Sequence, residues 1–211
     1  MFNDRYGLTD AVIEGRKTMT RRLAASKRKY VKMRLWQPCL ELEYGLYGCT
    51  EDEFWEYIEP HYVPGEVVAV AQSYKDLGYS DFALDRDPKD VQHVRGTLKQ
   101  SAGWNNKLFV RAEACKHRIR ITGIRCERLQ DISDEDCMKE GVVGGIIGYY
   151  VPGIQCKDWS KESYVDTEDG RTWKLFPTPR QAFAALIDKV SGRGTWKSNP
   201  WVVVYEFELV K

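Results

Sequence analysis

The chain has 211 residues, 43% of them hydrophobic and 30% charged, which is the balance of an ordinary globular protein. Its 32 basic and 31 acidic residues leave a formal net charge of +1, which excludes a general attraction to polyanions but allows a local basic patch. Because the sequence has no membrane-length apolar run and no basic-then-apolar leader, we expect a cytoplasmic protein with free cysteines.

The first predicted element is a short helix over residues 8–15, with Thr9 as its N-cap and Gly15 as its left-handed end. It leads into a stretch, residues 15–34, with nine basic residues and no acid, which is followed by seven acids and no base up to residue 60. Two interpretations remain open: a solvated basic arm that pairs with the acidic stretch, or a cationic face for a phosphate backbone.

Three weakly patterned stretches, about residues 24–61, 76–106 and 142–177, are predicted to be insertions, the last a long loop or lid. The aromatic residues between positions 30 and 62 either stack on bases or form a small core of the first insertion. We favour the core.

Strands are predicted over residues 66–71, buried on both faces, and over residues 107–112 and 117–124. A helix follows Ser133 and ends at Gly141, which places Glu140 in its last turn. A carboxylate at the negative end of a helix is disfavoured by about 0.3–1 kcal/mol, so we expect the fold to supply a cationic neighbour; the alternative is an exposed glutamate without one.

The last predicted elements are a helix over residues 178–190 and a half-exposed strand over residues 201–210. Short strands separated by helices, without regular strand–helix–strand repeats, indicate an α+β fold: a small β-barrel decorated by helices.

Segment 15–22 has the form G-x-K-x-x-T-x-R and resembles the signature of the ASCH domain family, which belongs to the PUA-like superfamily. Residues 64–68, 119–140 and 196–207 resemble later parts of ASCH proteins, in the expected order. The resemblance implies one PUA-like domain over residues 1–211, with the three insertions and with a basic cleft suited to RNA or nucleotides.

One ASCH subgroup hydrolyses the exocyclic amide of N4-acetylcytidine, and its motif residues match four positions of this chain. By resemblance the catalytic residues are Lys17, Thr20, Arg22 and Glu140. Thr20 would be the nucleophile and Lys17 its base, with a pKa lowered by the like charges of neighbouring arginines. Arg22 would stabilise the oxyanion, and Glu140 would hold Lys17 or protonate the leaving amine.

Geometry sets a condition on this assignment. Lys17 and Thr20 are an odd number of residues apart and would face opposite sides of a straight strand, so residues 17–19 must turn if both line one cleft. A purely structural alternative is that Thr20 bonds to the backbone and Lys17 forms an ion pair with Glu140.

Three functional hypotheses remain: an amidohydrolase acting on an N4-acylated cytidine, an RNA-binding module without chemistry, and another hydrolase or accessory protein. No cofactor or metal is expected, because the histidines are dispersed and no Cys-x-x-Cys pair occurs. The expected nucleic-acid contacts are Arg16, Arg21, Lys27, Arg28, Lys29, Arg118 and Arg120.

Overall fold

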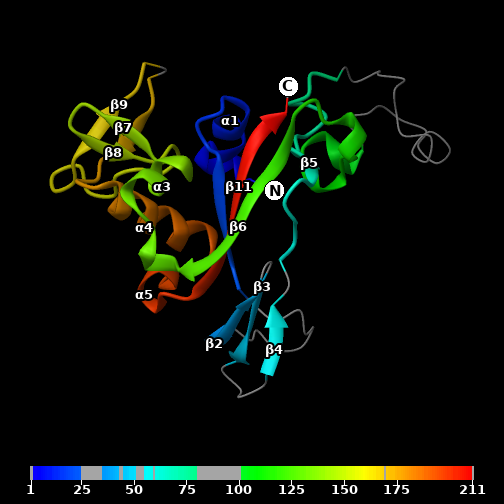
Figure 1. The fold of residues 1–211 in the computed structure, drawn as a ribbon. Coiled ribbons are helices and arrows are strands. Elements are labelled where there is room, and N and C mark those ends of the chain that lie inside the picture. Colours follow the sequence, from blue (N-terminus) through cyan, green and yellow to red (C-terminus); the bar gives the residue numbers. More distant parts are fainter. Residues whose placement is uncertain are drawn as a thin grey trace.

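The computed structural model describes residues 2–24, 35–42, 45–50, 55–58, 60–79, 101–168 and 170–210. Its centre is a four-stranded antiparallel sheet in the order β1-β11-β6-β5, which curls into half of a barrel (Figure 1). The expected α+β class is confirmed at this level. The strands of this sheet are β1 (Met19–Leu23), β5 (Val67–Ala69), β6 (Arg118–Arg128) and β11 (Trp201–Val210).

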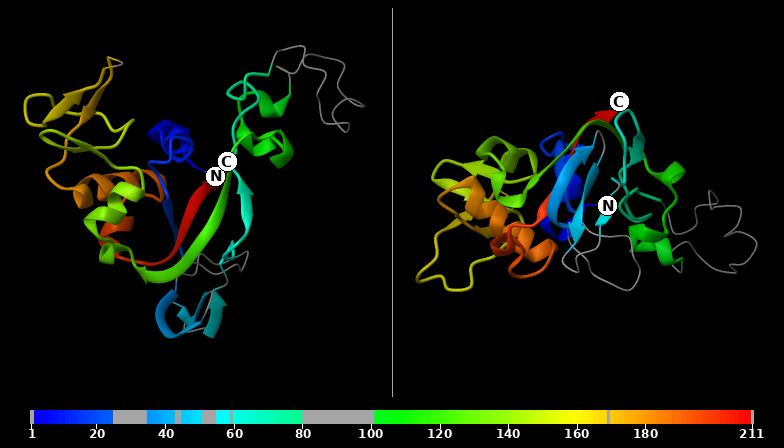
Figure 2. Two further views of the ribbon diagram at one scale, coloured as in Figure 1. Left: turned by 45° about the horizontal axis from the view of Figure 1, so that its top comes forward. Right: turned by 60° about the horizontal axis from the view of Figure 1, so that its bottom comes forward.

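The helices and two small hairpins lie mostly on one side of the curled sheet, and short helical turns lie beside its β5 edge (Figures 1 and 2). The hairpins are β7–β8 and β9–β10. The bounds are α1 (Leu8–Ile13), α3 (Asp134–Lys139), β7 (Val143–Gly145), β8 (Gly148–Tyr150), β9 (Tyr164–Asp166), β10 (Thr172–Lys174), α4 (Pro179–Val190) and α5 (Thr195–Ser198).

Strand β11 separates two hydrophobic cores. Val202 and Val204 pack with the α3 and α4 side of the protein, whereas Val203 and Tyr205 pack with the β5 and β6 side. The predicted half-exposed strand is confirmed from Tyr205 to Glu208, where buried aromatic side chains alternate with more exposed glutamates. It is wrong over residues 202–204, because β11 lies between β1 and β6 and has both faces covered there.

Two predicted helices are confirmed with their caps. The Ser133 side chain accepts a hydrogen bond from the Asp136 backbone N–H (3.1 Å), and Thr178 accepts one from Gln181 (3.2 Å). At the first helix the predicted cap is wrong. A preceding helical turn over Asp4–Tyr6 places the cap at Gly7, and Thr9 lies inside α1 with its hydroxyl donating to Asp4.

Two predicted strands need correction. Residues 107–112 form helical turns rather than a strand, because the Asn106 side chain accepts a hydrogen bond from the Leu108 backbone and begins a turn there. In the described part of the chain β5 pairs only with β6, so Val67 is 46% exposed rather than buried.

The predicted insertions contain regular structure. The described parts of the first form a three-stranded sheet of β2 (Leu35–Leu42), β3 (Gly45–Thr50) and β4 (Trp55–Ile58). The third contains both hairpins and contributes Val151 and Ile154 to the main core, so it is part of the folded body. Most of the second lies outside the described residues. Among the described helices, none has the length and apolar character needed to cross a bilayer.

Candidate active site

The segment over residues 15–22 turns between α1 and β1. Gly15 has a φ of +75°, the Lys17 N–H donates to the Ala11 carbonyl (2.8 Å), and the Thr18 N–H donates to the Lys139 carbonyl (3.0 Å). Strand β1 begins only at Met19. Lys17 and Thr20 line the same cavity, as the assignment requires. The turn lies over residues 14–16, just before the predicted position at residues 17–19.

Lys17 and Glu140 form a buried ion pair, although they are 123 positions apart in the sequence. The Lys17 Nζ lies 2.6 Å from Glu140 Oε2, and the two side chains are 2% and 5% exposed. Nζ also donates to the carbonyl oxygens of Met19 (2.7 Å) and Glu140 (2.8 Å). Each N–H of the ammonium group therefore has an acceptor within the protein.

Glu140 also meets Arg21, whose Nη1 lies 3.1 Å from Glu140 Oε1. The expectation that the fold supplies a cation at this helix end is thus confirmed twice. Arg21 reaches two further carboxylates, Glu127 (2.6 Å) and Asp136 (3.1 Å), and its side chain is fully buried. A guanidinium enclosed in this way has no surface to offer a phosphate.

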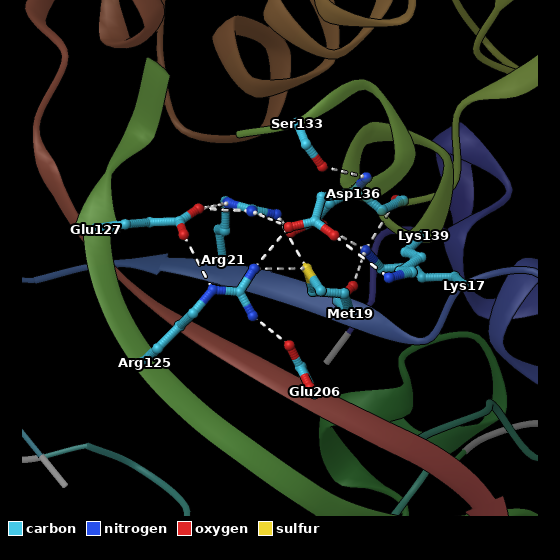
Figure 3. Close-up of polar contacts among 10 residues, drawn as sticks. Lys17, Met19, Arg21, Arg125, Glu127, Ser133, Asp136, Lys139 and Glu206 are labelled. Atoms are coloured by element: carbon cyan, nitrogen blue, oxygen red, sulfur yellow. Dashed lines mark hydrogen bonds and ion pairs between the residues drawn. The ribbon is translucent and has the colours of Figure 1, made fainter. Parts of the chain in front are cut away.

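A second arginine continues the network, as Figure 3 shows. Arg125 lies 2.6 Å from Asp136 Oδ2 and 3.0 Å from Glu127 Oε2, and it also pairs with Glu206. The network joins β1, β6, α3 and β11. It holds the segment that carries Lys17 against the end of α3, where Glu140 lies.

Burial lowers the pKa of the Lys17 ammonium, and the nearby charges of Arg22 and Arg21 act in the same direction, whereas Glu140 opposes them. We predicted lowering by like charges; removal from water is the larger cause. Arg16 was expected to contribute but is exposed and donates to Glu14 (2.7 Å).

The cavity beside this network has a volume of about 390 Å³, within the range of small-molecule sites. Lys17, Thr20, Arg22 and Glu140 line it together. The opposite wall is apolar, because α4 turns Phe183, Leu186 and Ile187 toward it. The Thr20 hydroxyl has no hydrogen-bond partner among the described residues, so no hydrogen bond links it to the Lys17 ammonium.

His61 also lines the cavity and was not predicted. Its backbone N–H donates to the phenol oxygen of Tyr205 (2.8 Å), and Tyr205 lies opposite Thr20 across β1 and β11. Burial raises the pKa of that phenol. This contact joins residues 144 positions apart, so no local signal in the sequence could have found it.

Two further expected nucleic-acid contacts, Arg118 and Arg120, do not line this cavity. Arg118 and Arg120 lie on β6 with exposed side chains, and Arg120 pairs with Glu208 (3.1 Å). Lys27, Arg28 and Lys29 lie outside the described residues, as do most of the aromatic side chains between positions 30 and 62.

Comparisons of the chain with protein-family models, with curated proteins and with solved structures found no match.

Proposed function

We propose that the protein is an ASCH-type domain with a PUA-like barrel, and that its cavity binds a modified cytidine nucleoside, free or in RNA, and removes an acyl group from N4. One observation carries the proposal: Lys17, Thr20, Arg22 and Glu140, which match the ASCH amidohydrolase motif, line a single cavity from two distant segments.

The proposed reaction begins when the Thr20 hydroxyl oxygen attacks the amide carbonyl carbon of the substrate. Lys17 takes the hydroxyl proton after passing one of its own to Glu140, at 2.6 Å. Arg22 stabilises the negative charge on the carbonyl oxygen. The bond to N4 then breaks, and Glu140 returns the proton to the leaving amine. Water hydrolyses the resulting ester of Thr20 and releases the carboxylic acid.

A second candidate function is RNA binding without chemistry. The specific observation in its favour is that all three N–H groups of Lys17 already have acceptors within the protein, one of them the Glu140 carboxylate. In that case Lys17 is a structural cation. Binding through phosphate contacts would weaken steeply as salt rises, and a flat salt response would exclude it.

A turnover assay with N4-acetylcytidine tests the proposal. We expect hydrolysis by the unmodified protein and a loss of roughly 100-fold or more for Thr20→Val, which keeps the shape of the side chain and removes its hydroxyl. Thr18→Val is the matched control, because Thr18 is a nearby threonine that does not line the cavity. Full activity of T20V would refute Thr20 as the nucleophile, and no turnover by the unmodified protein would refute the hydrolysis of N4-acetylcytidine.

A further inference from the structure

A second cavity of about 380 Å³ lies on another face of α4, and four basic side chains are among the residues that line it. Lys189 faces it from α4, and Arg5 comes from the helical turn before α1. Lys157 and Lys174 come from the segment that contains β9 and β10. Four cations therefore surround one hollow, and one of them, Arg5, comes from a segment about 150 positions or more away from the other three.

Only one of these cations is neutralised within the cavity. Among the described residues, Glu162 is the one carboxylate in the lining, and it pairs with Lys174 and accepts a hydrogen bond from the Lys157 backbone N–H (2.7 Å). The hydrogen bond from Lys174 lowers the pKa of Glu162, so this carboxylate stays ionised. Both of its oxygens already accept hydrogen bonds from the protein.

The remaining three cations, on Arg5, Lys157 and Lys189, have no carboxylate partner among the described residues. The Arg5 guanidinium lies 6.0 Å from the ring of Tyr6, and the two lysines are exposed. Like charges around one hollow repel each other, and a bound anion would remove this repulsion.

The two cavities share two walls. The Phe183, Leu186 and Ile187 side of α4 faces the first, and its Lys189 faces the second. The N-terminal segment also contributes to both cavities: Asn3 lines the first, and Arg5 lines the second. Because consecutive Cα atoms are 3.8 Å apart, those two residues lie within about 7.6 Å of each other.

We propose that the second cavity binds backbone phosphates of an RNA strand whose modified cytidine occupies the first cavity. This inference rests on the proposed function, and it makes the substrate an RNA rather than a free nucleoside. Lysine and arginine side chains are the usual phosphate contacts, and such contacts position a strand without reading its sequence.

The test is the binding of a fluorescein-labelled, single-stranded oligoribonucleotide of eight nucleotides, measured by anisotropy over a series of salt concentrations. Each phosphate contact in a single strand adds about 0.7 to the slope of log affinity against log salt. The double variant Lys157→Gln/Lys189→Gln should therefore flatten the slope by about 1.4. Lys197→Gln is the matched control, because Lys197 is an exposed lysine on α5 outside both cavities.

The same proteins are assayed with N4-acetylcytidine, which separates the two proposals. If nucleoside turnover occurs and the double variant keeps the original slope, the phosphate subsite is refuted and the proposed function stands. If the slope flattens and no protein turns over the nucleoside, the subsite stands and the hydrolysis is refuted. Inorganic phosphate and a glutamate octapeptide serve as competitors, and we expect each to bind at least tenfold more weakly than the oligoribonucleotide. Equal or tighter binding of either would overturn the assignment to RNA.

Discussion

Replacing Glu140 by glutamine should destabilise the protein strongly, because the change leaves Lys17 buried without a counter-ion. The Glu140 side chain is 5% exposed and contacts both Lys17 and Arg21. Arg21 keeps Glu127 and Asp136, but Lys17 is left with neutral acceptors alone, the carbonyl oxygens of Met19 and residue 140 and the amide oxygen of the new side chain. Removing one partner of a buried ion pair costs about 3–5 kcal/mol, and we expect a loss of this size in the free energy of unfolding at pH 7.

The loss should depend on pH in a defined direction. Glu140 is the main group that opposes the lowering of the Lys17 pKa, so in the variant this pKa falls further below its ordinary value of 10.5. At a pH between the Lys17 pKa of the folded protein and that of the unfolded chain, Lys17 is protonated in the unfolded chain but not in the folded protein. Because the unfolded chain then binds more protons, the free energy of unfolding rises with pH. The deficit of the variant relative to the unmodified protein should therefore shrink as the pH rises from the folded-state Lys17 pKa of the variant to that of the unmodified protein, both of which lie below 10.5.

Urea unfolding of both proteins at several pH values measures this deficit. Glu208→Gln is the control, because Glu208 forms an exposed ion pair with Arg120 at 3.1 Å and should lose less than about 1 kcal/mol. A deficit of E140Q no larger than that of E208Q would refute the reasoning. So would a deficit that grows as the pH rises.

Three further predictions concern single positions. Ser133→Ala should lower the free energy of unfolding by about 1 kcal/mol through loss of the α3 cap, measured by urea titration; no change would mean that the cap is dispensable. Gly141→Ala should lower the melting temperature more than Gly15→Ala: both glycines have a positive φ, but only at Gly141 would a Cβ meet a core atom, 3.0 Å away on Leu8. Equal shifts would contradict the role of this contact. Burial raises the pKa of the Cys137 thiol to about 12, so this cysteine should resist alkylation by iodoacetamide at pH 8 until the protein unfolds, as followed by peptide mass spectrometry; rapid labelling of the native protein would be inconsistent with that burial.

Local patterns were sufficient for several elements of the fold. The caps at Ser133 and Thr178 predicted α3 and α4, because capping depends on residues only three positions apart. The placement of Glu140 at a helix end predicted a cationic neighbour, but not which cation. The stretch at 107–112 was misread, because its apolar composition resembles a strand while the preceding Asn106 side chain favours a turn.

What the sequence determined by itself is what short-range chemistry determines: the positions of α3 and α4, the turn at Gly15 and the presence of a cation-rich motif. Tertiary structure alone decided that Arg21 faces carboxylates rather than solvent, that residues 202–204 of β11 are covered on both faces, and that the cavity also receives His61 and the apolar side of α4. The physical reason is that burial, and with it the protonation and availability of a charge, depends on strand order and on which distant segments meet. These are properties of the packed chain, and no window of neighbouring residues contains them.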